Sequence, residues 1–517
     1  MQSTFQTKAQ QRTFSFCAVA LSIYIAYISY FAQSPFLQSL PETVGALLYF
    51  GLFSFLLYKT LTGLCFRYVK PLYTPSVAQH FSPRFFCLSA LLAFGILCIA
   101  FMAYYPGGVS YDAYNQWQQV QTGQYNNWHP MGHTLMIALL TTLCNHYAFV
   151  VFIQIILFSL AFAYLLTTIH RYGTSAWLLL LLEGVLVASE GVSHTLLYVW
   201  KDNIMTIAMV ILCAYSVRIY HSRGKWLAKP LHVGLLGLCF SIPMIVRHNG
   251  VLAVLPLFLC LLCCVGKYRK KLGITALVWV LCLGMMSYVY TQFDVVYPNN
   301  TLEESVGLPM TLLCNQKQLD ESRLSDETNA FLNELATPET WQTVYRQNDY
   351  NSIKFTYPRE YIKYVDPALL FRMVTDTALS NPRLAFTTFN NVTDIVWGIQ
   401  GENVGYSPLR NSGHLSSAPK QNSTRNQLGS VGLSLLRAPL SALPFTYLLQ
   451  NIGVQLLILL LCTLYALYRK GVIALVFVVP ILVYHLATML LLCGNDARFF
   501  AFSLVTMLPS ALVLIRK

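Results

Sequence analysis

Long apolar stretches, separated by short polar connections, run through most of the chain. A helix that crosses a lipid bilayer needs about 20 apolar residues, and many of these stretches reach or approach that length. We therefore expect an all-α polytopic membrane protein with about 11–13 transmembrane helices. The expected spans cover 14–32, 43–62, 85–105, 131–169 as one long or two short segments, 175–190, 196–217, 231–246, 250–266, 272–292, 449–468, 472–492 and 498–515.

A polar stretch of about 150 residues interrupts this pattern before the last three spans. Aromatic and aliphatic residues recur in it, and Pro367 and Pro382 precede apolar-periodic runs, as at helix starts. The segment 401–430 is rich in Gly, Ser and Asn, which predicts a mobile loop. We expect three parts: a transmembrane core over 1–292 with a large outer loop at 106–130, a mostly helical extracytoplasmic region over 293–447, and C-terminal transmembrane helices over 448–517.

Composition narrows the class of protein. Hydrophobic residues make up 56% of the chain and charged residues 11%, whereas soluble proteins carry about 25% charged residues. This excludes a cytosolic enzyme, a disordered protein and a disulfide-built secreted domain. The net charge of +13 does not indicate a nucleic-acid partner, because the basic residues cluster in short connections, as in cytoplasmic loops. We expect a multi-pass cell-membrane protein with a cytoplasmic N-terminus. The basic clusters are Lys8 and Arg12, 59–84, 218–229, 267–271, 469–470 and 516–517.

The same rule constrains the chain between the outer loop 106–130 and the basic loop 218–229. These loops lie on opposite sides, so an odd number of crossings must separate them. Four apolar segments are available. We expect 131–169 to be the exception, either as one bent span or with a short helix in the membrane plane at its start.

Acidic residues are scarce outside the extracytoplasmic region, where 15 of the 21 lie. A charge at bilayer depth costs at least ~2.5–3.5 kcal/mol, so each remaining acid needs a reason. The expected topology gathers four of these six acids and three basic residues on the outer face. We therefore predict a polar cavity that opens outward, with cations for an anionic headgroup and a carboxylate for acid–base chemistry. The acids are Asp112, Glu190, Asp202 and Asp496, and the basic residues are Lys201, Arg247 and Arg498.

Each of these residues also has a simpler explanation. Asp112 could cap a helix over 113–121, and Lys201 and Asp202 could neutralise each other locally. Arg247 with His248 could mark a turn, and Arg498 could anchor a helix end at the membrane interface.

The outer loop contains no Lys or Arg and alternates aromatic with amide side chains. Aromatic faces and amides are what a sugar-binding surface requires. Trp and Tyr are also favoured at any membrane interface, so both interpretations stay open. The aromatic residues include Tyr104, Tyr105, Tyr111, Tyr114, Trp117, Tyr125 and Trp128.

The motifs resemble those of the GT-C superfamily, polytopic glycosyltransferases that use polyprenyl-phosphate-linked sugars as donors. An acidic residue lies in a long outer loop after an early span (Asp112 in PGGVSYD), and His129–Pro130 open the next apolar run. An arginine–aromatic motif, DARFF, precedes the final span. The sequence is most similar to an uncharacterised bacterial multipass membrane family with D…HP, KDN and R-NG signatures. Asp112 stands alone rather than in an acidic pair, so a divalent metal is not supported and we expect no cofactor.

The resemblance implies displacement at the anomeric carbon of the donor sugar. Asp112 would be the catalytic general base that takes the proton of an acceptor hydroxyl, and Lys201, Arg247 and Arg498 would bind the donor phosphate. The partners would be the membrane, a polyprenyl-phosphate sugar lipid and a glycan, lipid or protein acceptor of the cell envelope. The expected substrate pocket comprises Tyr111, His129, Asp202, Asn203, His248, Asn249 and Asp496.

Two other function classes compete with this one. A transporter or flippase for a lipid-linked or anionic solute would place its binding groups near the bilayer midplane, in two repeated halves. The sequence shows no internal repeat, and Glu183 is the acid that falls deep in a span. A scaffold protein would leave the outward polar cluster without a purpose.

Overall fold

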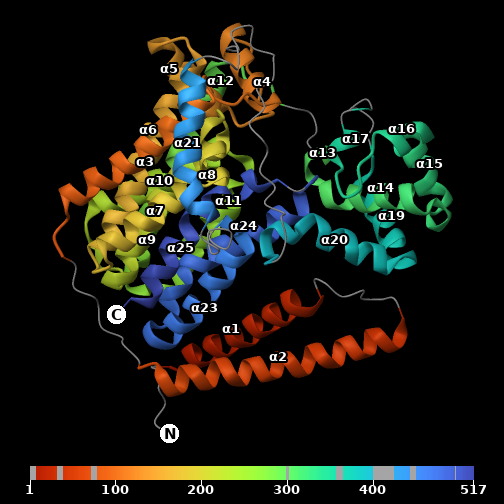
Figure 1. The fold of residues 1–517 in the computed structure, drawn as a ribbon, viewed down its shortest axis with the longest axis horizontal. Coiled ribbons are helices and arrows are strands. Elements are labelled where there is room, and N and C mark those ends of the chain that lie inside the picture. The colour runs from red at the N-terminus through yellow and green to blue at the C-terminus, as the bar shows by residue number, and fades with distance from the viewer. Residues whose placement is uncertain are drawn as a thin grey trace.

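The computed structural model describes residues 7–31, 39–70, 79–297, 302–354, 356, 365–399, 424–442, 450–494 and 496–516. Every regular element in these residues is a helix. Most helices form one bundle, and a smaller helical lobe lies beside it (Figure 1). A hairpin of α1 (Lys8–Ala26) and α2 (Leu40–Tyr68) lies across one end of the bundle (Figure 1).

The long helices are apolar enough to cross a membrane. In the described residues, nine helices pass tests of length and hydropathy, and a tenth span results if α7 (Ala176–Ala188) and α8 (Glu190–Leu197), which bend by 60° at their break, are counted as one. An all-α polytopic membrane protein is thereby confirmed. Besides α1 and α2, the long helices are α3 (Pro83–Ala103), α6 (Tyr147–His170), α9 (Lys201–Ser222), α12 (Arg269–Gln292), α23 (Ile452–Lys470), α24 (Leu475–Leu491) and α25 (Ala501–Ile515).

This number is lower than the expected 11–13 because two of the expected spans are short. The polar turn at Arg247 separates α10 (Pro230–Val246) from α11 (Val251–Cys264), and neither helix reaches 18 residues. Both nevertheless run through the bundle. The Arg247 guanidinium lies over the Phe499 ring at one end, and Cys264 Sγ contacts the Val472 carbonyl at the other.

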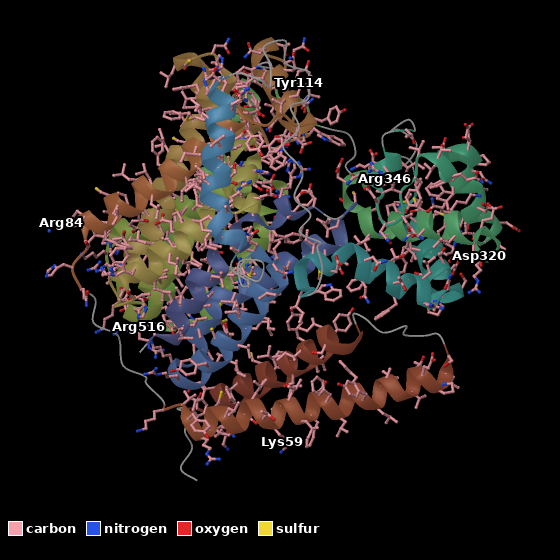
Figure 2. The ribbon with its side chains drawn as sticks, in the orientation of Figure 1. Lys59, Arg84, Tyr114, Asp320, Arg346 and Arg516 are labelled. Atoms are coloured by element: carbon pink, nitrogen blue, oxygen red, sulfur yellow. The ribbon has the colours of Figure 1, made fainter. Side chains whose placement is uncertain are left out.

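The bundle has two ends, and at each end segments that are distant in the sequence contact one another. At the first, which we call the Asp112 end, the Tyr147 hydroxyl donates to the Gly108 carbonyl. At the second, which we call the Lys470 end, Arg171 donates to the Gln79 carbonyl. Figure 2 places Tyr114 near the Asp112 end and Arg516 near the Lys470 end.

The stretch 131–169 is two helices rather than one. The 13-residue α5 (Met131–Leu143) precedes α6 and is too short to cross a bilayer. Between the outer loop and the basic loop 218–229, the remaining segments α6, α7–α8 and α9 make three passes. This is the odd number that the charge pattern requires.

The lobe has a hydrophobic core of its own, which includes Met310, Leu332, Trp341 and Tyr350. It joins the bundle at the turn that follows α24, where the Asn351 amide donates to the Cys493 carbonyl. The helices that contribute to this core are α14 (Gly307–Leu319), α15 (Asp326–Leu335), α16 (Pro338–Thr343), α17 (Asn351–Lys354) and α19 (Pro367–Ser380).

The expected region 293–447 contributes helices to both the lobe and the bundle. α20 (Pro382–Trp397) packs on α14 and α19 of the lobe as well as on α23, whereas α21 (Thr424–Ser441) packs along α3 of the bundle. The first residues of α21 fall within the loop expected at 401–430, and they are helical. The rest of that loop, 401–423, lies outside the described residues.

Glycine allows α21 to approach α3 closely. A Cβ on Gly429 would lie 2.2 Å from the Ala103 nitrogen, whereas a Cβ on Gly95 of α3 would meet nothing within 4 Å. We expect Gly429→Ala to lower the free energy of unfolding by about 1–3 kcal/mol, because backbone must shift. The control Gly95→Ala should change it by less than about 1 kcal/mol. Unfolding in mixed micelles measures both, and equal effects would contradict this packing.

A candidate active site around Asp112

Asp112 lies in the first turn of α4 (Tyr111–Thr122), but it does not cap that helix. The N-cap is Ser110, whose hydroxyl accepts from the Ala113 amide. Trp200 fixes the same hydroxyl by donating to it from its indole nitrogen at 2.7 Å. The helix-cap explanation of Asp112 is therefore wrong, and its carboxylate is available for other contacts.

Three basic side chains from three other segments surround the Asp112 carboxylate. Arg498 Nη1 donates to Asp112 Oδ2 at 3.1 Å, and Lys201 Nζ lies 4.0 Å from the same oxygen. His129 Nε2 lies 3.9 Å from Asp112 Oδ1, and Lys201 Nζ is 2.8 Å from His129 Nδ1. The loop before α5, the start of α9 and the turn before α25 thus meet at α4. We call Asp112, His129, Lys201, Asp496 and Arg498 the Asp112 cluster.

Arg498 is held on several sides. Its Nε lies 2.8 Å from Asp496 Oδ2, and its backbone amide donates to Asp496 Oδ1. Its guanidinium lies over the rings of Trp200 and Phe499, 5.0 and 4.9 Å from their centroids. These contacts fix the Arg498 guanidinium beside Asp112, while its role as an anchor at the membrane interface stays an alternative.

A second ion pair lies behind the Asp112 cluster. Arg247 pairs with Asp202, and the two side chains are only 6% and 4% exposed. Arg247 also donates to Asn249 Oδ1 at 2.5 Å and lies over the Phe499 ring. Lys201 and Asp202 therefore pair with different partners, and the local ion pair suggested by their adjacency is wrong.

The turn that carries Arg247 needs a glycine at position 250. A Cβ there would lie 2.2 Å from the Pro243 carbonyl oxygen. His248 links the turn to the outer loop through a 3.2 Å contact between its Nε2 and the Asn127 carbonyl. The turn thus holds Arg247 in place, and His248 contacts the outer loop rather than Asp112.

Electrostatics set the charges of the two central titratable groups. Burial raises the pKa of the Asp112 carboxyl, but the charges of Arg498 and Lys201 outweigh it and bring the pKa well below its usual range. Burial, with the nearby Lys201 charge, lowers the pKa of His129 to about 3. At neutral pH the carboxylate is therefore charged and the imidazole neutral, so His129 Nδ1 accepts from the Lys201 ammonium.

Other expected pocket residues lie beside the cluster rather than in it. Tyr111 is 78% exposed at the start of α4. Asn203 is fully buried and donates to the carbonyls of Thr195 and Tyr198 at 2.7 and 2.9 Å. Asn203 therefore links α9 to α8. Within the described residues, no contact joins the Asn203 side chain to Asp112.

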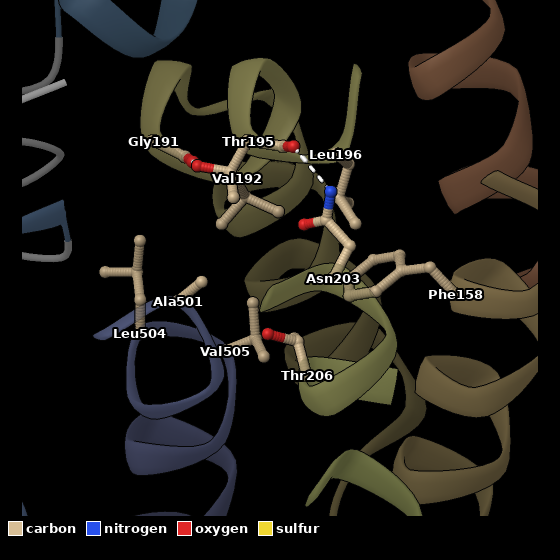
Figure 3. Close-up of a pocket in the computed structure, with 10 residues that line it drawn as sticks. All are labelled: Phe158, Gly191, Val192, Thr195, Leu196, Asn203, Thr206, Ala501, Leu504 and Val505. Atoms are coloured by element: carbon tan, nitrogen blue, oxygen red, sulfur yellow. Dashed lines mark hydrogen bonds between the residues drawn. The ribbon is translucent and has the colours of Figure 1, made fainter. Parts of the chain in front are cut away.

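A small, mostly apolar cavity of about 10 Å³, room for about one water molecule, lies among α6, α8, α9 and α25 (Figure 3). Asn203 contributes a polar group to its wall, where it bonds to Thr195 (Figure 3). The lining residues of the cavity are Phe158, Gly191, Val192, Thr195, Leu196, Asn203, Thr206, Ala501, Leu504 and Val505.

The structure adds residues that the sequence did not indicate. Gln116 of α4 donates to Thr134 Oγ1 at 3.0 Å and pairs with His133 Nδ1 at 3.1 Å, which fixes α4 against α5. Glu304, in the short helix α13 (Leu302–Ser305) that packs on α24, lies in electrostatic reach of Lys201 and pairs with Lys354 of the lobe at 2.6 Å. His133 could have been noticed in the sequence as a polar residue on an otherwise apolar helix. No local sequence pattern marks Glu304.

The charges of the Asp112 cluster balance one another. Two carboxylates and a neutral imidazole are matched there by an ammonium and a guanidinium. In the part of the chain that the structure describes, no group of three or more His, Cys, Asp or Glu side chains could hold a metal ion.

Comparisons of this chain with protein-family models, with curated proteins and with solved structures found no match. Any functional interpretation therefore depends on the site itself and on the motifs.

Proposed function

We propose that the chain is an integral membrane glycosyltransferase that moves a sugar from a polyprenyl-phosphate-linked donor to a cell-envelope acceptor, with Asp112 as general base. The observation that carries the proposal is that Arg498 and Lys201 both lie beside the Asp112 carboxylate, at one end of a membrane bundle. The likeness of the PGGVSYD, HP and DARFF motifs to GT-C glycosyltransferases supports it. The proposal places this end on the outer face of the cell membrane.

The donor phosphate would compete with Asp112 for the same two cations. A guanidinium binds phosphate oxygens in a bidentate manner, and an ammonium acts as a point charge. When the phosphate takes over these contacts, Asp112 loses the charges that lower its pKa. Donor binding would therefore make the carboxylate a better base at the moment when a base is needed.

The reaction then follows from these positions. Asp112 accepts the proton of the acceptor hydroxyl. At the same time, the oxygen of that hydroxyl bonds to the anomeric carbon. The bond between that carbon and the phosphate oxygen breaks, and the polyprenyl phosphate leaves as an anion. Arg498 and Lys201 stabilise the charge that develops on the leaving oxygen. Asp496, which holds Arg498 at 2.8 Å, would act as a positioning residue.

Arg247 has a different role in this proposal from the phosphate ligand that the sequence suggested. Its charge is already paired with the buried Asp202, and its guanidinium supports the Phe499 ring on which Arg498 also lies. We therefore assign it to positioning.

A panel of polyprenyl-phosphate sugars, incubated with the purified protein in lipid, tests the proposal. We expect polyprenyl phosphate to be released only in the presence of an acceptor. In Lys201→Gln, kcat/KM for the donor should fall about 10–100-fold, because one charge-assisted contact to phosphate is lost. The control Lys225→Gln removes an exposed lysine at the Lys470 end and should have no effect. No turnover with any donor, or equal activity of both variants, would contradict the proposal.

A transporter or flippase of a lipid-linked or anionic solute is the second candidate. The 60° break between α7 and α8 favours it, because transporters bind solutes at broken helices. The same assay separates the two functions: a flippase moves the donor lipid across a vesicle membrane and forms no glycosylated product.

A further inference from the structure

The Lys470 end holds a second group of basic residues that the proposed transfer does not use. Lys470 ends α23, and its backbone carbonyl accepts from Arg223, which follows α9. Lys470 Nζ lies over the Tyr220 ring at 4.9 Å. The neighbouring His221 stacks on Tyr172 with their ring centroids 3.9 Å apart. The C-terminal ends of α6, α9 and α23 therefore meet near the Lys470 ammonium.

These side chains are buried, yet several of their polar atoms are left without a partner. Lys470 is 4% exposed, and Tyr220 and His221 are each 2% exposed. Within the described residues, Lys470 Nζ, the Tyr220 hydroxyl, His221 Nδ1 and Arg469 Nε are buried and make no hydrogen bond. Buried polar atoms are almost always satisfied in native proteins, so a cluster of unsatisfied donors needs an explanation.

The charges around Lys470 are also unbalanced. Lys470 is repelled by both Arg469 and Arg223. No ion pair in the described part of the chain joins Lys470 or Arg469 to a carboxylate. A buried cation without a counter-ion is strongly destabilising. An anion from outside the chain would neutralise it and accept from the free donors.

We propose that Lys470, Arg469, Arg223 and Tyr220 form a binding site for a phosphate group, which belongs either to a free phosphate or to the headgroup of an anionic lipid. Basic pockets between transmembrane helices on the cytoplasmic side bind acidic headgroups by this chemistry. The charge pattern places this end of the bundle there. The site is separate from the Asp112 cluster, and the inference does not depend on the proposed transferase activity.

Thermal unfolding of the full-length protein tests the site and distinguishes the two sources. One arm titrates inorganic phosphate into delipidated protein in detergent, with sodium chloride of equal ionic strength as the reference. The other compares nanodiscs of phosphatidylcholine alone with nanodiscs that also contain phosphatidylglycerol. Lys470→Met removes the central charge, Lys470→Arg keeps it, and Lys225→Met removes an exposed lysine at the same end as a matched control.

We expect one of the two anions to raise the Tm of the wild type, of Lys470→Arg and of Lys225→Met, since a ligand stabilises the state that it binds. In Lys470→Met the apparent affinity should fall at least ~10-fold. Without the anion, Lys470→Met should melt no lower than the wild type, because it removes a buried unpaired charge; a purely structural lysine would lower the Tm at every anion concentration. The proposal is overturned if neither anion stabilises the wild type, or if Lys470→Met responds as the wild type does.

Discussion

Asp112→Asn should lower the turnover rate by orders of magnitude without unfolding the protein. The asparagine keeps the shape of the side chain, but it cannot accept the proton of the acceptor hydroxyl. We expect kcat to fall by about 10²–10⁴-fold, the usual contribution of a general base. The rate of polyprenyl-phosphate release by the purified variant measures this loss, and binding of the labelled donor lipid should persist because Lys201 and Arg498 remain.

Asp320→Asn is a suitable control for this change. Asp320 pairs with Arg323 on the surface of the lobe, and both side chains are largely exposed. Its substitution should leave the rate unchanged, since exposed ion pairs contribute little. An Asp112→Asn variant that melts as the wild type does and retains at least half of its rate would exclude Asp112 as the base.

Breaking the buried pair of Arg247 and Asp202 should cause the largest loss of stability. Either Arg247→Met or Asp202→Leu alone leaves one charge buried without its partner, which costs about 3–5 kcal/mol. The double variant removes both charges and should recover most of that loss. The free energy of unfolding in mixed micelles, measured for both single variants and the double, gives the coupling of the pair directly.

Glu190 offers the comparison at an exposed pair. It contacts Arg437 at 3.1 Å, but its side chain is 56% exposed. Glu190→Gln should therefore lower the free energy of unfolding by about 1 kcal/mol or less. If the Arg247 and Asp202 losses are simply additive in the double variant, the pair does not act as a unit and the positioning role of Arg247 is wrong.

The sequence predicted the membrane architecture and the convergence at the Asp112 end because both follow from simple physical rules. Apolar length marks the spans, and basic loops fix which ends of the helices lie together. Asp112, Lys201 and Arg498 lie at the ends of helices on the same side, so their approach could be expected. The three passes between 130 and 218 followed from charge parity in the same way.

The partners of these residues could not be predicted. Lys201 and Asp202 are adjacent, but consecutive residues on a helix point in different directions, so each pairs elsewhere. The packing of α21 on α3 rather than on the lobe was also missed, because an amphipathic helix carries no mark of the surface that will cover it. Glu304, which precedes the lobe, comes into electrostatic reach of Lys201 only in the folded chain.

The most direct test of the site is a structure of the protein with bound polyprenyl phosphate in a lipid nanodisc. The proposal predicts that the phosphate lies between Arg498 and Lys201, within hydrogen-bond reach of both, and that the Asp112 carboxylate has separated from Arg498 to face the acceptor side. A phosphate bound elsewhere, with the contact between Asp112 and Arg498 intact at about 3.1 Å, would contradict the account.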